Sequence, residues 1–395
     1  MDDGYSAGRA AARLALEGAG AETADLVLVF AGARHGADDF AGVLSAVRET
    51  AGSAAAMAGC STTGIITAAD EIENASAVAV LVLAGGDALP APLFQSPIRE
   101  EPREAGLRLG QAARARLGGG AGGDGGVEGA ALVVLVDPNH LDATAFVNGI
   151  AEGAPGLTVV GAGASGRKDA DARVFARGRA VADAAVAFLI PSTLHPTSGT
   201  SHGCQGVSEP LTITAVEHNV IVEIDGRPAV DVLREALELP GNRPLEKLSV
   251  PLLAGLGDRL CDGRSDYVVR PFVVSEDDPR SLAVPEPVHV GQTIRFTLRD
   301  AISAREDMKT MLEEQATLRA GLATAFGLFF NCAGRGSALY GQSGLDPELI
   351  RRRFGSLPLV GIESTFEIAP TCGRPQVHML TGVLLLAGNA AGPAN

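Results

Sequence analysis

Phe329-Phe330-Asn331-Cys332-Ala333-Gly334-Arg335-Gly336 is the stretch that decides how the rest of this chain is interpreted. A short apolar run, typical of a buried strand, ends here at a loop of small and polar residues. The same pattern recurs in Leu359–Ile368, and a helix-like segment, Asp346–Phe354, lies between the two. These segments predict a strand–helix–strand unit whose two loops lie at the same end of a parallel sheet. Open α/β sheets bind ligands at that end.

Length and composition narrow the class of protein. A chain of 395 residues is long for one core, so two domains are expected. The net charge of −15 and the absence of Trp argue against nucleic acid, which needs a basic face and aromatic platforms. The same charge argues against an anionic membrane surface and favours solubility.

The location expected from the sequence is the cytoplasm. The acidic N-terminus leads into no apolar leader segment, and the longest apolar runs are too short to span a bilayer. The five cysteines are scattered and form no CxxC pair, which predicts free thiols and no structural zinc site.

The order of elements repeats along the chain. Apolar strands, a helical segment and polar loops follow one another in the same order in three places: residues 25–83, 130–190 and 325–386. This repetition predicts an α/β fold of repeated strand–helix–strand units, with mixed sheets flanked by helices, built by duplication. Between the second and third copies, the sequence predicts alternating, half-solvated antiparallel strands and a charged helix, Asp300–Ala320. This region therefore does not repeat the strand–helix–strand pattern. The boundary falls in the polar segment Pro191–Pro210, so we expect domains at 1–200 and 201–395.

One glycine motif resembles a dinucleotide fingerprint but lacks its context. Gly161-Ala162-Gly163-Ala164-Ser165-Gly166 fits G-x-G-x-x-G and follows a strand. The fingerprint requires a helix to begin at the last glycine, and a charged segment and a hairpin pattern follow here instead. A glycine loop between strands is therefore favoured over a Rossmann site.

Two loops carry thiols beside polar groups. Cys60-Ser61-Thr62-Thr63 follows a buried strand and predicts either a ligand-lining loop or close packing. Both are favoured over a catalytic nucleophile, which would need a base within reach. Cys332 lies near Arg335, whose charge favours a thiolate, although free Cys more often points into a core. Arg335 is expected either to bind a ligand carboxylate or to pair with Glu363 or Glu367.

The seven histidines show no metal-ligand spacing, so no metal site is predicted. His35 and His140 occupy equivalent positions just after strands in the first two copies. Either of these, or His378, is a candidate to face a ligand.

Taken together and in order, the motifs resemble the FIST domain family over nearly the whole chain, from about Ala24 to Leu386. The C-terminal half is similar in Asn331–Gly336, Phe354–Gly361, Glu367–Pro370 and His378–Thr381, and its beginning in Ser201–Gln205 and Val222–Ala229. The N-terminal half is similar in Gly59–Gly64 and Gly161–Gly166. Phe366 departs from the family pattern, which often has Gly before the Glu.

The resemblance implies a sensory domain, not an enzyme, that binds a small, amino-acid-like metabolite. In this interpretation Arg335 binds a ligand carboxylate and Glu367 accepts from a ligand amine. The expected lining residues are Cys60, Ser61, Thr63, Asn331, Cys332, Thr365 and His378. Because no signalling segment is evident in the sequence, output is expected through a separate protein partner or a homo-oligomer.

Two other functions stay open. Some members of the family are associated with haem, so a haem-binding gas sensor with a histidine ligand is one alternative to a cofactor-free protein. The other alternative is a thiol-dependent enzyme that uses Cys332 or Cys60 with a histidine base.

Overall fold

The computed structural model describes residues 4–32, 37–84, 89–118, 127–167, 171–238, 251–258 and 267–389. The chain divides into two compact units. The first comprises Met1–Thr200, Met311–Val377 and Thr381–Asn395, and the second comprises Ser201–Thr310 and His378–Leu380. The predicted division after residue 200 coincides with the end of the first segment, but most of the C-terminal third returns to the first unit.

The first unit contains the three predicted copies, each in the order strand, helix, strand, hairpin, strand. The first copy is β1 (Leu26–Gly32), α2 (Ala37–Ala51), β2 (Ala56–Thr62), β3 (Gly64–Thr67), β4 (Glu71–Glu73) and β5 (Val78–Leu83). The second is β7 (Ala131–Val136), α4 (Ala143–Gly153), β8 (Thr158–Gly163), β9 (Val174–Ala176), β10 (Arg179–Val181) and β11 (Ala185–Ile190). The third is β22 (Phe326–Cys332), α8 (Leu345–Phe354), β23 (Leu359–Ser364), β24 (Glu367–Thr371), β25 (Arg374–His378) and β26 (Gly382–Ala387).

Each copy forms the same three-stranded centre. Its first strand lies between the second strand, which is parallel to it, and the last strand, which is antiparallel: β2-β1-β5, β8-β7-β11 and β23-β22-β26. The prediction of a repeated α/β unit in mixed sheets is confirmed.

The hairpins are exchanged between the copies in a cycle. The hairpin β3–β4 of the first copy pairs through β3 with β23 of the third. The hairpin β24–β25 of the third copy joins β8 of the second, and β9–β10 of the second joins β2 of the first. Every sheet of the first unit therefore contains strands from two copies, so no copy completes its own sheet.

A glycine at the same place in each second strand marks the duplication. A Cβ built on Gly59, Gly161 or Gly361 would lie 1.8, 1.9 or 2.3 Å from a carbonyl oxygen of the neighbouring first strand. Real Cβ atoms do not approach so closely, so each position excludes a side chain for a packing reason.

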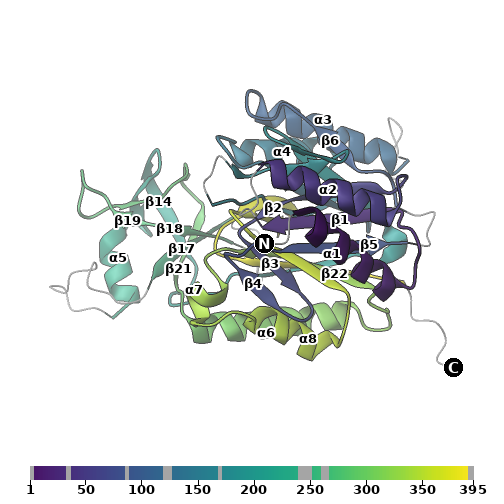
Figure 1. The fold of residues 1–395 in the computed structure, drawn as a ribbon. Coiled ribbons are helices and arrows are strands. Elements are labelled where there is room, and N and C mark those ends of the chain that lie inside the picture. The colour runs from purple at the N-terminus through teal and green to yellow at the C-terminus, as the bar shows by residue number, and fades with distance from the viewer. Residues whose placement is uncertain are drawn as a thin grey trace. The chain divides into compact units, whose positions relative to one another are not determined.

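One apolar core joins the three sheets. It contains side chains from the first strand of every copy, among them Leu28, Val133 and Leu328, all at most 1% exposed. On the outer faces, α1 (Gly4–Ala19) and α2 pack with the sheet of β1, and α3 (Pro102–Arg116) and α4 pack with the sheet of β7 (Figure 1). The first unit is therefore layered, with the shared core inside and these helices outside.

Further elements extend these sheets. β6 (Leu93–Gln95) pairs with β11, and β12 (Thr197–Ser201) joins the edge at β26. The charged helix forms as α6 (Ala301–Leu318), the short helix α7 (Gly336–Tyr340) precedes α8, and Ser192–Leu194 forms a 3₁₀ turn. The glycine-rich residues 118–129, whose composition predicts a flexible loop, lie mostly outside the described residues.

The second unit is built on antiparallel strands. They are β13 (Gln205–Gly206), β14 (Leu211–Glu217), β15 (Val220–Ile224), β16 (Arg227–Pro228), β17 (Leu252–Gly257), β18 (Val268–Pro271), β19 (Val273–Val274), β20 (Leu282–Ala283) and β21 (Thr293–Leu298). The hairpin of β14 and β15 turns at His218-Asn219, and α5 (Ala229–Ala236) packs its apolar face on the sheet. Across the described residues of both units, no helix has the length and apolar character needed to cross a bilayer.

Candidate functional site

The ends of the second strands of the three copies, and the polar residues that follow them, meet in the first unit. Ser61 Oγ donates to the carbonyl oxygen of Ser165 at 3.0 Å, and Thr63 N donates to Ser165 Oγ at 2.9 Å. Ser165 Oγ also donates to the carbonyl oxygen of Glu363, and Thr365 Oγ1 donates to that of Ala164 at 3.2 Å. The cyclic arrangement of the copies thus brings together three loops that are about one to three hundred residues apart.

A row of residues crosses the third sheet beside these loops. Asn331 of β22 pairs with Glu363 of β23, and Gly64 of β3 pairs with Glu73 of β4. A Cβ on Gly64 would lie 2.3 Å from the Cδ atom of Glu363, so the glutamate side chain extends across the glycine toward β4. Residues that pair across a sheet share a face, which places Glu73 and Glu363 on the same side.

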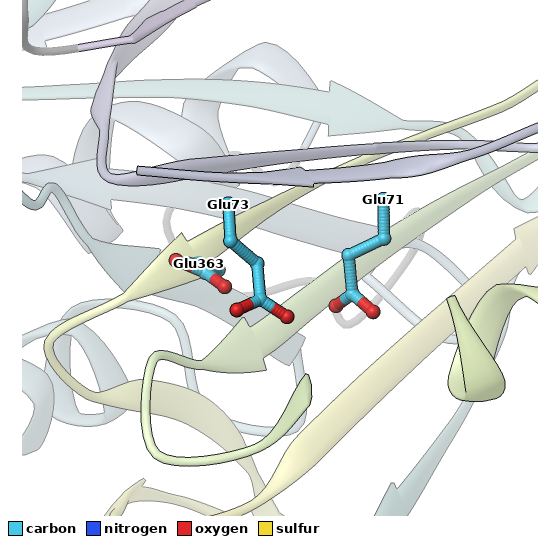
Figure 2. Close-up of side chains that lie close together, drawn as sticks. All are labelled: Glu71, Glu73 and Glu363. Atoms are coloured by element: carbon cyan, nitrogen blue, oxygen red, sulfur yellow. The ribbon is translucent and has the colours of Figure 1, made fainter. Parts of the chain in front are cut away.

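Three carboxylates converge at the end of this row. Glu71 and Glu73 alternate with Ile72 on β4 and therefore share a face, and they project to the same side, with Glu73 between Glu71 and Glu363 (Figure 2). One carboxylate oxygen from each lies within 4.8 Å of the others. This is the only such group of His, Cys, Asp or Glu among the residues that the structure describes.

Backbone and hydroxyl donors hold the three carboxylates. Glu71 accepts from Gly344 N at 2.6 Å, and Glu73 accepts from Ser337 N at 2.7 Å and from the hydroxyl of the same serine. Glu363 accepts from Thr63 Oγ1 at 3.1 Å. Within the described part of the chain, no Lys or Arg forms an ion pair with any of the three.

The environment disfavours three negative charges. Burial, followed by the charges of Asp346 and Glu73, raises the pKa of Glu71 to about 7. Burial, followed by the charges of Glu73 and Glu71, raises the pKa of Glu363 to about 7. Near neutral pH the pair of carboxyls therefore retains protons that free glutamates would have lost, and a cation that entered the cluster would displace them.

Asn331 adds an amide to the cluster. Its side chain is fully buried, and Nδ2 donates a long hydrogen bond of 3.4 Å to Glu71. Its Oδ1 atom is buried and has no hydrogen-bond partner within the described residues. A buried amide oxygen without a partner is costly, and here it belongs to a side chain that already contacts the carboxylates.

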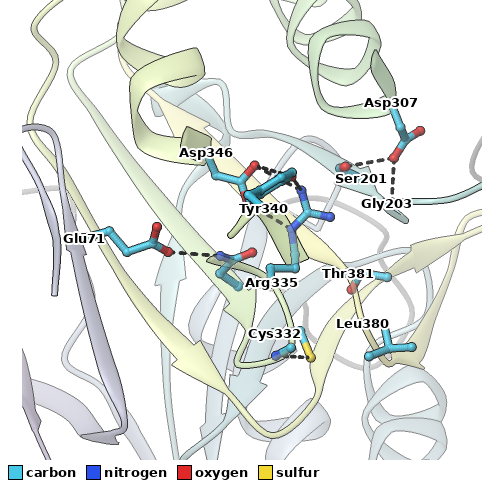
Figure 3. A network of polar contacts seen from close by, with 12 residues as sticks. Glu71, Ser201, Gly203, Asp307, Cys332, Arg335, Tyr340, Asp346, Leu380 and Thr381 are labelled. Atoms are coloured by element: carbon cyan, nitrogen blue, oxygen red, sulfur yellow. Dashed lines mark hydrogen bonds and ion pairs between the residues drawn. The ribbon is translucent and has the colours of Figure 1, made fainter. Parts of the chain in front are cut away.

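Arg335 has a partner that the sequence interpretation did not anticipate. Its Nε and Nη2 atoms form a bidentate ion pair with Asp346, at 3.0 and 3.1 Å (Figure 3). Nη2 also donates to Tyr340 Oη at 2.8 Å. Both charged side chains are fully buried. The predicted pairing with Glu363 or Glu367 is thus replaced by Asp346, and the pair ties the start of the 335–346 segment to its end.

Glu367 is fully buried and held by protein donors. Thr381 donates to Oε2 from its backbone N at 3.2 Å and from Oγ1 at 2.6 Å, and Ser364 Oγ lies 2.8 Å from Oε1. Burial raises the pKa of this carboxyl to about 7, although the hydrogen bonds from Thr381 act in the opposite direction. The role predicted for Glu367 toward a ligand amine stays a prediction.

The thiols lie in buried surroundings. Cys60 belongs to the apolar core, and burial raises the pKa of its thiol, which opposes thiolate formation. Cys332 Sγ accepts from Gly334 N at 3.4 Å. The expectation of free thiols holds for Cys60, Cys204 and Cys332 but not for Cys372, which is disulfide-bonded. Spacing along the sequence does not reveal which cysteines the fold brings together.

His378 belongs to the other unit. There its ring stacks on that of His202, with centroids 5.7 Å apart, and His202 also stacks on Tyr267 at 4.6 Å. His35, the candidate of the first copy, lies outside the described residues. The remaining eight predicted residues (Cys60, Ser61, Thr63, Asn331, Cys332, Arg335, Thr365 and Glu367) all lie in the first unit.

Sequence reasoning missed Glu71 and Glu73. The signal was present, because the alternation Glu71-Ile72-Glu73 directs both carboxylates to one side of a strand. The segment was not recognised as a strand, since it forms only a short hairpin on a sheet of another copy.

Comparison with known proteins agrees with this architecture. Residues 25–227 match the FIST N domain, and residues 229–370 match the FIST C domain. The chain belongs to the FIST family. Relatives that this FIST protein resembles are uncharacterized proteins of mycobacteria. One from Mycobacterium tuberculosis is 30% identical over 388 residues, 96% of this chain and 95% of the relative. One from Mycobacterium bovis is 30% identical over 365 residues, 91% and 89% of the two chains.

Proposed function

We propose that this FIST protein is a cytoplasmic sensory domain that binds a small, amino-acid-like molecule through its protonated amine. The amine would occupy the cluster formed by Glu71, Glu73 and Glu363. The observation that carries the proposal is the convergence of three carboxylates without a basic partner in the described part of the first unit.

The charge balance supports a cationic ligand. A buried negative charge without a counter-charge is unfavourable, so the cluster must take up protons or a cation. A primary ammonium group carries three N–H donors, one for each carboxylate of the cluster. The unpartnered Oδ1 of Asn331 is a further acceptor beside it.

The same carboxylates offer a route from binding to output. Glu71 and Glu73 hold the backbone of Gly344 and Ser337, at the two ends of the segment that carries α7. An amine that forms new hydrogen bonds with these carboxylates would weaken their hydrogen bonds to the backbone of that segment. The segment would then become more mobile or change its conformation. The ion pair of Arg335 with Asp346 closes the segment, so a ligand carboxylate that competes with Asp346 would act on it as well.

Matched small molecules test which group is recognised. Alanine carries both groups, alaninamide only the amine, and propionate only the carboxylate, and homologous sets extend the series to larger side chains. After native mass spectrometry and an absorbance spectrum have identified any co-purified molecule or haem, calorimetry measures the affinity of each series. The proposal expects amines to bind and Glu363→Gln to weaken that binding, whereas any binding of carboxylates without an amine should be unaffected by Glu363→Gln.

The pH dependence gives a second test. Because the pKa values of Glu71 and Glu363 are about 7, amine affinity should rise between pH 6 and 8 and binding should release protons. Glu363→Gln should weaken binding at least tenfold, whereas Glu128→Gln, at an exposed position, should not. Binding of Mg²⁺ or Ca²⁺ but of no amine would assign the cluster to a metal ion and refute the amine.

A further inference from the structure

A cavity elsewhere in the first unit has the opposite chemical character to the carboxylate cluster. It encloses about 260 Å³ between the beginning of β2, the strand β6 and the turn that joins β9 to β10. Its buried apolar surface comes from Met57, Leu93 and Val186, with Phe94 beside them. A cavity of this size accommodates the body of a small organic molecule.

Two guanidinium groups line this cavity. Arg48 comes from the last turn of α2, and Arg177 comes from the turn between β9 and β10. The Cζ atom of Arg177 lies 5.2 Å from the centre of the Phe94 ring, a cation–π contact that places the guanidinium beside the cavity wall, and both arginine side chains also reach solvent. A Cβ on Gly178 would lie 3.0 Å from Nη1 of Arg48, so the glycine makes room for that group.

The charge around this cavity differs from that of the chain as a whole. The protein carries a net charge of −15, yet no acidic residue is among the described residues that line the cavity. Neither guanidinium forms an ion pair with another residue in the described part of the chain. Arginines that face an apolar cavity without a carboxylate partner provide the positive charge and planar donors that an anion requires.

We propose that this cavity binds a small amphipathic anion, a carboxylate attached to an aromatic or short aliphatic body. The apolar body lies against Met57, Leu93 and Val186, and its ring or chain contacts Phe94. The carboxylate accepts from Arg48 and Arg177. This site is independent of the amine site, because it involves different residues and the opposite charge.

Calorimetry with benzoate and octanoate tests the proposal on the full-length protein. Benzamide, which matches benzoate in shape but is neutral, and inorganic phosphate, which lacks an apolar body, are the matched ligands. We expect benzoate or octanoate to bind, benzamide to bind at least tenfold more weakly, and phosphate not to compete. Equal competition by phosphate would reduce the site to a simple anion site and overturn the proposal.

Variants locate the binding. Arg48→Gln and Arg177→Gln should each weaken benzoate binding about tenfold or more, whereas Arg13→Gln, on an exposed part of α1, should leave it unchanged. Circular dichroism verifies that the variants fold. Glu363→Gln should leave benzoate affinity unchanged, so failure of the amine site and failure of this cavity are distinguished. Absence of benzoate and octanoate binding, or binding that survives both arginine substitutions, would refute the inference.

Discussion

Glu367 should be a neutral carboxylic acid in the folded protein at pH 6, and Glu367→Gln tests this. Ser364 Oγ lies 2.9 Å from the carbonyl oxygen of Asn331 and 2.8 Å from Oε1 of Glu367. A hydroxyl has one proton, and a carbonyl only accepts. All three groups are satisfied when the serine donates to the carbonyl and Glu367 carries a proton that it donates to the serine.

The size of the effect follows from the pKa. Burial raises the pKa of Glu367 from 4.5 to about 7. Between these values the folded protein binds more protons than the unfolded chain, so the free energy of unfolding falls as pH rises through that window. At about 1.4 kcal/mol for each pH unit, Glu367 reduces stability by about 3 kcal/mol between pH 4.5 and pH 8.

Glutamine imitates the protonated carboxyl at every pH. Its amide N–H replaces the donor to Ser364, and its oxygen accepts from Thr381. Glu367→Gln should therefore match the parent protein near pH 4.5 and exceed its free energy of unfolding by about 3 kcal/mol at pH 8. A substitution at a fully buried charged residue would thus stabilise the protein.

Urea unfolding at a series of pH values from 4.5 to 8 measures this difference. Far-UV circular dichroism is the suitable probe, because the chain contains no Trp. Glu128→Gln, at an exposed site, is the control and should show no comparable trend. A loss of several kcal/mol by Glu367→Gln at pH 8, or a difference that does not change with pH, would show that the carboxyl is ionised and that the reasoning is wrong.

Three further predictions concern the same sheet. Arg335→Met should lower the free energy of unfolding by about 3–5 kcal/mol, because Asp346 stays buried without its partner. The double variant Arg335→Met/Asp346→Asn should recover part of this loss in a double-mutant cycle measured by urea unfolding. Gly64→Ala should abolish amine binding in calorimetry while the protein stays folded, because the new methyl group would overlap the Glu363 side chain. Unchanged amine affinity would show that the amine does not bind at the carboxylate cluster. Gly361→Ala should lower the thermal midpoint strongly, since its Cβ would meet a strand carbonyl at 2.3 Å, and a midpoint within a degree of the parent would contradict that packing argument.

The repeated α/β unit was predictable because its signals are local. Each signal depends on a short run of neighbouring residues: an apolar strand, a helix such as the one with Pro347 in its first turn, or a small polar loop. The order of these elements could therefore be recognised in all three copies. Of the candidate site, Asn331 and Thr63 were identified for this reason, and both contact the carboxylate cluster. Glu363 was named only as a possible partner of Arg335.

The partner of Arg335 shows where local reasoning ends. Asp346 is eleven residues away, at the beginning of α8, but it was interpreted only as part of a helix. Which carboxylate a guanidinium reaches depends on how the loop before that helix folds back. Several acids were available, and charge alone did not distinguish them.

The sequence by itself determined the long buried strands and the helices, their threefold repetition and the positions where polar residues follow buried strands. These features depend on residues that are neighbours in the chain. Only the tertiary structure decided that the hairpins are exchanged in a cycle. That exchange places Glu71 and Glu73 on the sheet of the third copy, beside Glu363, although about 290 residues separate them in sequence. The physical reason is that an edge strand pairs with whichever sheet offers unpaired backbone groups and a complementary apolar face, and these are properties of the assembled core.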